Sequence, residues 1–191
     1  MKKRVSIKNI IIGTILGMIA FYHLFIISGA FALLYEDPLE PVIKYGEFPI
    51  TVIYELNGEI KERKDVIVCE YAGIENWGTG GKHRKWTSEY ISGNDYLFLL
   101  MGEEDGVKFT LSVEMPNWLA SYYMDDLDPM YREERERELK RINQKLLLTQ
   151  FVDGGWVQRT LAGDEVYEKY KLRVLEVRHS LPINNSYYVA D

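Results

Sequence analysis

The stretch FPITVIYELNGEIKERKDVIVCEYAG, residues 48–73, decides the fold. Its first half alternates in polarity and is rich in β-branched residues and tyrosine, which predicts a strand. Asn57-Gly58 is the preferred two-residue hairpin turn, because both central positions need φ > 0. The returning strand starts with charged residues and then becomes VIVCEY, so its far end is expected to enter the core.

The sequence beyond residue 90 predicts a second hairpin and two helices. Residues 95–115 read as strand, turn and strand, and DGG at 153–155 reads as another turn. A charged helix is expected from Pro129 to about Leu148, with Asp128 as its cap. A short helix over 163–171 and a strand over 172–179 end the pattern. The expected class is α+β, mainly antiparallel β, behind an N-terminal transmembrane helix.

The N-terminal segment has the pattern of a membrane anchor. Residues 10–34 contain no formal charge, and 25 helical residues can span a bilayer core of about 30 Å. Cations precede this run and acids follow it, which places the N-terminus in the cytoplasm and the rest outside. We therefore divide the chain into the tail 1–9, the transmembrane helix 10–35, the stalk 36–43 and the extracytoplasmic domain 44–191.

Two further features of this segment have alternative interpretations. AFA at 30–32 fits a signal-peptide cleavage site after Ala32, which would release a secreted protein, but the apolar run is longer than a signal peptide needs. Gly13 and Gly17 form a GxxxG pattern that could pack two membrane helices into a weak homodimer. The first expected partner of the uncleaved segment is the lipid bilayer, through residues 10–34.

Composition excludes several classes of function. Four of the 23 Lys and Arg residues precede the apolar run, so residues 36–191 carry 19 cations against 29 acids, a net charge of −10. Such a charge argues against a nucleic-acid partner. Cys69 is the single cysteine, so an intramolecular disulfide is impossible and the domain depends on its core. Motifs for a metal site, a cofactor or a catalytic serine are lacking, so no metal or cofactor is expected.

The stretch ENWGTGGKHRKW, residues 75–86, is the part that most suggests a binding site. It fails as a phosphate-binding Walker A loop, since Asn76 stands where the first glycine belongs and His83 follows Lys82. It is better interpreted as a glycine-rich corner between two strands. The candidate binding residues are the aromatic and basic side chains at and beside this corner, Tyr71, Trp77, His83, Arg84 and Trp86.

Four segments carry a family resemblance. They are PVIKYGEFPITVIYELNGE at 41–59, VCEYAGIENWGTGGKHRKW at 68–86, ASYYMDD at 120–126 and YEKYKLRVLEVRHSLPINNSYY at 167–188. Together they resemble an uncharacterised family of small, single-pass membrane-anchored proteins of Gram-positive bacteria. The chain departs from it in the charged helix and in Tyr167, where the family has tryptophan. The resemblance implies an envelope protein and supplies no catalytic residue.

Two functions remain open. The first is a non-enzymatic module that binds an envelope protein or cell-wall glycan, or joins an envelope complex. The second is a cell-wall-active hydrolase with two facing carboxylates in a cleft. The sequence favours the first, because it contains no recognisable catalytic constellation.

Overall fold

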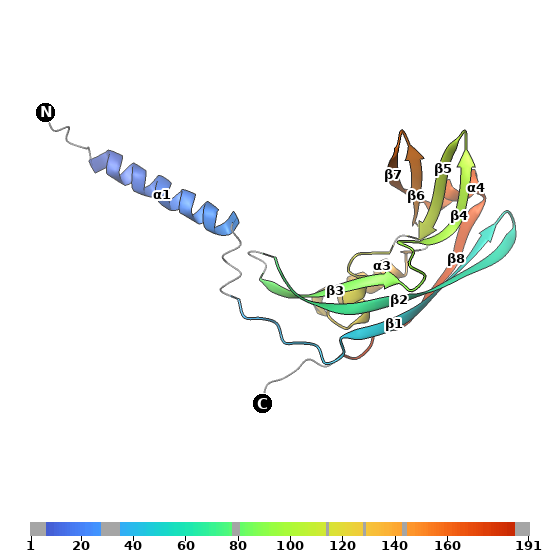
Figure 1. The fold of residues 1–191 in the computed structure, drawn as a ribbon, viewed down its shortest axis with the longest axis horizontal. Helices are drawn as coiled ribbons and strands as arrows, with labels where there is room; N and C mark the ends of the chain where they lie inside the picture. The colour runs from blue at the N-terminus through green and yellow to red at the C-terminus, as the bar shows by residue number, and fades with distance from the viewer. Residues whose placement is uncertain are drawn as a thin grey trace. The chain divides into compact units, whose positions relative to one another are not determined.

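A computed structural model of the chain describes residues 7–27, 35–77, 81–113, 115–127, 129–142 and 145–185 (Figure 1). The chain divides into two compact units. Over the described residues, unit 1 contains the chain up to Glu40 together with Ala72–Lys85, and unit 2 contains Pro41–Tyr71 and the chain from Trp86 to Asn185. The predicted tail residues 1–6, the cleavage site at Ala32 and the cap Asp128 lie outside the described residues.

The opening hairpin forms as expected and builds the first sheet. Its four strands have the order β3-β2-β1-β8. They are β1 (Tyr45–Leu56), β2 (Glu59–Asn76), β3 (Lys82–Tyr90) and β8 (Leu172–His179). β1 pairs with both β2 and β8 in antiparallel register, with Leu56 opposite Glu59 beside the turn. Asn57 and Gly58 both have positive φ, so the predicted turn is confirmed.

The second sheet is a four-stranded antiparallel meander. The strands β4 (Leu97–Glu104), β5 (Val107–Val113), β6 (Lys145–Val152) and β7 (Gly155–Ala162) follow one another in space as in sequence. The expected hairpin over 95–115 is β4–β5, and DGG is the turn between β6 and β7. In β5, Phe109, Leu111 and Val113 are buried, and so is Ser112.

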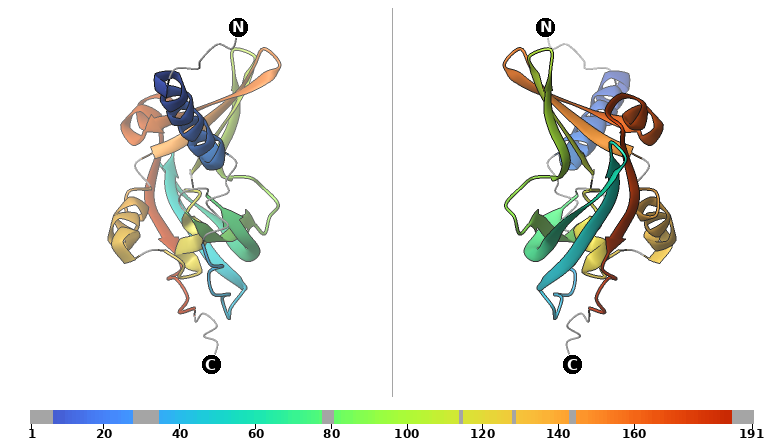
Figure 2. Two further views of the ribbon diagram at one scale, coloured as in Figure 1. Left: turned by 90° about the vertical axis from the view of Figure 1, so that its left-hand side faces the viewer. Right: turned by 90° about the vertical axis from the view of Figure 1, so that its right-hand side faces the viewer.

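The charged helix is shorter in the structure than predicted. α3 (Pro129–Leu139) begins at the predicted proline but ends nine residues before Leu148, and residues 145–148 belong to β6. The reason is burial: Leu146, Leu147 and Leu148 are all buried between β5 and β7, whereas a solvated charged helix would leave part of this apolar run exposed. α2 (Leu119–Tyr123) was not expected, and α4 (Gly163–Tyr170) is the predicted short helix, which contacts β6, β7 and β8 (Figure 2).

One hydrophobic core joins both sheets, and it lies wholly in unit 2. Its members come from each of the strands β1 to β8, from the helices α2, α3 and α4, and from Met124. Phe48 of β1 stacks on Tyr123 of α2 with ring centroids 4.4 Å apart. Cys69 is completely buried in this core, and burial raises the pKa of its thiol to about 12. The α+β, mainly antiparallel class is confirmed.

The N-terminal helix α1 (Ile7–Ile27) covers most of the described part of the predicted anchor. Every α1 side chain whose exposure is described, at positions 7, 8 and 11–24, is exposed. Among the described residues, no helix is found that is both long and apolar enough to cross a bilayer. Residues 28–34 of the predicted span lie outside the described part of the chain, so the span stays a prediction.

Candidate functional site

The corner between β2 and β3 presents an exposed aromatic pair. Trp77 is 60% exposed, and its ring stacks on His83 with a centroid separation of 4.2 Å and an interplanar angle of 29°. The Trp77 amide donates to the Gly81 carbonyl over 2.9 Å, which closes the corner at its base. Residues 78–80 lie outside the described part. The ends of β2 and β3 agree with the interpretation as a strand corner.

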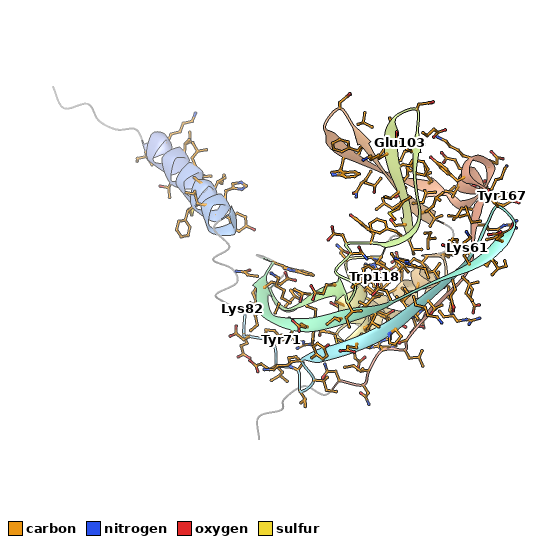
Figure 3. The ribbon with its side chains drawn as sticks, turned by 45° about the vertical axis from the view of Figure 1, so that its right-hand side comes forward. Lys61, Tyr71, Lys82, Glu103, Trp118 and Tyr167 are labelled. Atoms are coloured by element: carbon orange, nitrogen blue, oxygen red, sulfur yellow. The ribbon has the colours of Figure 1, made fainter. Side chains whose placement is uncertain are left out.

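The stalk residues are attached to this corner inside unit 1. Lys82 Nζ lies 2.6 Å from Asp37 Oδ1 (Figure 3), and Arg84 Nη1 donates to the Leu39 carbonyl over 3.0 Å. The Tyr35 ring packs against Gly81, where an added Cβ would lie 3.3 Å from Tyr35 Cδ1. Three successive contacts thus bind residues 35–39 to residues 81–84.

Tyr71 and Trp86 form a second and different pair within unit 2. Their rings meet edge to face with centroids 5.4 Å apart, and Lys44 Nζ lies 5.5 Å from the Tyr71 centroid. Trp86 Nε1 donates to Asp126 Oδ2 over 2.6 Å, and Asp125 beside it pairs with Arg132. Because Trp86 packs on the core and its only donor is engaged, this pair joins α2 to the sheet.

The five predicted binding residues therefore fall into two groups with different environments. Trp77, His83 and Arg84 belong to unit 1, whereas Tyr71 and Trp86 belong to unit 2. The aromatic residues of the α2 region are not available for binding, since Tyr122 and Tyr123 are buried in the core and Trp118 is half-buried. The predicted site thus divides into an exposed corner in unit 1 and a structural pair in unit 2.

The end of the β6–β7 hairpin carries an exposed apolar surface that the sequence interpretation missed. Phe151 and Trp156 lie directly opposite each other, with ring centroids 5.1 Å apart, and Trp156 is 65% exposed. Val152 and Val157 are exposed on the other face of the same two strands. We call these four residues the hairpin-end surface. The signal in the sequence was FVDGGWV, in which two apolar residues precede and two follow a turn.

Two acidic side chains line a cavity of about 210 Å³ in unit 2. Glu89 and Asp95 both line it, together with Ser88, Asn94 and Asn117. Both carboxylates are exposed to solvent. The catalytic acid of a glycoside hydrolase is typically held in a buried, apolar environment, whereas both of these side chains are exposed.

The predicted glycine pair, a metal site and the family resemblance complete the set of sequence predictions. Gly13 and Gly17 lie on α1 with nothing within 4 Å of an added Cβ, so the described structure leaves this face open. Over the described ranges, no group of three or more His, Cys, Asp or Glu side chains could hold a metal ion. Comparison with protein-family models, curated proteins and solved structures gives no match, so the family resemblance stays a prediction.

Proposed function

We propose that this chain is a single-pass membrane protein whose C-terminal domain acts outside the membrane as a non-enzymatic binding module. Residues 10–34 would span the bilayer, with the N-terminus in the cytoplasm. The partner would be an envelope protein that binds the hairpin-end surface.

The observation that carries the anchor is the exposure of α1. Residues 11–24 make almost four helical turns in which each side chain is exposed and none is charged. A helix that is apolar on all sides belongs in a protein core or in a bilayer. The described residues do not cover it, and the cations before it and acids after it fit an outward-facing C-terminal domain.

The observation that supports binding is the hairpin-end surface. β7 is the last strand in the order β4-β5-β6-β7, and its residues from Gly155 to Thr160 are all exposed. Apolar side chains on both faces of one hairpin fit a protein groove that closes around it. A glycan would instead use one flat aromatic face with polar groups beside it. The surface therefore favours a protein partner over a cell-wall glycan.

A topology experiment tests the anchor. Lys8→Cys and Glu134→Cys introduce exposed thiols before and after the span, and the buried Cys69 provides a silent background. Intact cells treated with an impermeant maleimide should label position 134 and leave position 8 unlabelled until the membrane is opened. Release of the protein by alkaline carbonate would refute the anchor. A mature chain that begins after Ala32 would establish the secreted alternative instead.

Site-specific photo-crosslinking tests the partner. A photoreactive amino acid at position 157 should give a discrete protein adduct in cells, and Phe151→Ser should abolish it. Val42 is a matched control, because it is an exposed valine of unit 2 outside the hairpin. Identical adducts at both positions would contradict the proposal. An adduct that a muramidase digests would identify a glycan as the partner.

A wall hydrolase is the second candidate, and the specific observation in its favour is that Glu89 and Asp95 share one cavity. It predicts that Glu89→Gln and Asp95→Asn each abolish release of soluble fragments from purified cell walls. Equal, background-level release by the wild-type protein and both variants would eliminate this candidate. The exposure of both acids leads us to favour the binding module.

A further inference from the structure

Unit 1 contains a second exposed apolar surface, separate from the hairpin-end surface. Tyr35, Leu39, Ile74 and Trp77 are all exposed, and we call these four residues the tip patch. Tyr35 and Leu39 come from the residues that follow the apolar run, Ile74 comes from β2, and Trp77 comes from the corner after β2. Lys85 is exposed at the start of β3, beside the corner.

Chain connectivity limits how far this patch can lie from the proposed bilayer. Tyr35 is the first residue after the apolar run, and an extended chain covers at most about 3.6 Å per residue. The polar layer on each side of a bilayer core is roughly 5–7 Å thick. Tyr35 therefore lies within this layer if residues 10–34 span the core.

The contacts of residues 35–39 keep the corner close to Tyr35. Gly81 packs directly on the Tyr35 ring, and Lys82 is paired with Asp37, three residues after the run. Asp37 can be at most about 11 Å from the last apolar residue along the chain. Trp77 is hydrogen-bonded to Gly81 and stacked on His83, so it belongs to the same small assembly.

We propose that the tip patch lies in the outer headgroup layer of the membrane and forms a second attachment of the protein to it. This inference rests on the proposed anchor. Trp and Tyr rings are preferred in this layer because one end of each ring is apolar and the other is polar. The Lys85 side chain can extend from the same surface to lipid phosphates.

Local charge defines the class of lipid. The segments 35–40 and 72–85 contain the carboxylates of Glu36, Asp37, Glu40 and Glu75 and the cations of Lys82, Arg84 and Lys85. With a slight excess of acids, the patch gains little from an anionic headgroup. Its ligand is therefore a phospholipid surface in general, held by aromatic and apolar contact.

The experiment places one fluorophore at the patch and one in the anchor. The full chain is reconstituted into vesicles of phosphatidylcholine, alone or mixed with phosphatidylglycerol, with NBD attached to Asn76→Cys or Phe21→Cys. Asn76 is exposed and adjoins Trp77, and the native thiol is buried. Lipids carrying a nitroxide on the headgroup or on the acyl chain serve as quenchers.

Headgroup nitroxides should quench the probe at position 76 by at least about twofold, equally in both lipid mixtures. Trp77→Ser should remove at least about half of this quenching. Trp156→Ser is the matched control, since Trp156 has nearly the same exposure and lies outside unit 1. It should leave the quenching unchanged.

The outcomes separate this inference from the anchor on which it rests. If acyl-chain nitroxides quench the probe at position 21 but headgroup nitroxides do not quench the probe at position 76, the tip patch does not contact the membrane. The proposed anchor is unaffected by that result. If position 21 is not quenched, the anchor itself is refuted. Quenching at position 76 that needs phosphatidylglycerol, or that is insensitive to Trp77→Ser, overturns the aromatic contact proposed here.

Discussion

Asn185 closes the C-terminal end of unit 2, and its replacement by alanine should destabilise the domain strongly. The side chain is only 6% exposed. Its amide donates to the carbonyls of Ile43 and Met124 over 2.8 and 3.2 Å, and its Oδ1 accepts from the Ile43 amide over 3.0 Å. One residue thus joins the segment before β1, the end of α2 and the C-terminal segment.

The magnitude follows from these three bonds. A net contribution of about 0.5–1.5 kcal/mol for each bond, plus about 1–3 kcal/mol for leaving the buried Met124 carbonyl unpaired, gives a loss of about 2.5–7.5 kcal/mol in the free energy of unfolding. Water can reach the Ile43 backbone after the truncation, since Ile43 is exposed, which argues for the lower half of this range.

The assay is urea unfolding of the full chain in detergent micelles, followed by tryptophan fluorescence. Asn184→Ala is the matched control, because Asn184 is the neighbouring asparagine and is exposed. It should change stability by less than about 0.5 kcal/mol. If Asn185→Ala behaved like Asn184→Ala, the three hydrogen bonds would not hold these segments together, and the reasoning would be refuted.

Three further changes test other parts of the fold. Ser112 Oγ is buried without a hydrogen-bond partner among the described residues, so Ser112→Ala should leave urea stability unchanged or raise it by up to about 1 kcal/mol; a clear loss would reveal a partner. Burial raises the pKa of the Cys69 thiol to about 12. The contribution of this thiol to the free energy of unfolding is therefore fully present below the unfolded pKa of about 8.5 and is lost as pH rises towards 12. Cys69→Ala should flatten the decline of stability at alkaline pH, measured by urea unfolding. Gly81 has φ +88° and touches Tyr35, so Gly81→Ala should speed proteolysis of residues 35–40, whereas Gly155→Ala should not.

The hairpins could be predicted because their turns are specified by two adjacent residues. Asn57-Gly58, Asp105-Gly106 and Asp153-Gly154 each adopt two successive positive φ values. Glycine and, to a lesser degree, asparagine and aspartate tolerate this conformation, so the signal is local and can be seen in the sequence. The division of eight strands into two sheets depends on contacts between distant segments, and no local signal specifies it.

The misassigned segment 145–148 illustrates this limit. Its residues have no helix breaker, and Leu139, Ile142 and Leu146 have the spacing of an apolar helical stripe. The strand prevails because β5 and β7 offer hydrogen bonds on both sides and bury the three consecutive leucines of β6. Local propensity is a weak preference, and tertiary burial of this size overrides it.

Whether an aromatic residue belongs to the candidate site depends on its neighbours in the fold as well as on its residue type. Trp77, Trp86 and Trp156 have identical side chains, yet Trp86 is half-buried with its indole nitrogen bonded to Asp126, while the other two are exposed. The sequence around Trp86 contains no sign of Asp126, which lies 40 residues away. An aromatic residue can contribute to binding only if the fold leaves its ring uncovered, and that depends on partners distant in sequence. The two exposed tryptophans belong to different units and have different flanking residues. Trp77 is attached to the residues that follow the proposed membrane span, which favours lipid, whereas Trp156 shares its hairpin with apolar side chains on both faces, which favours protein.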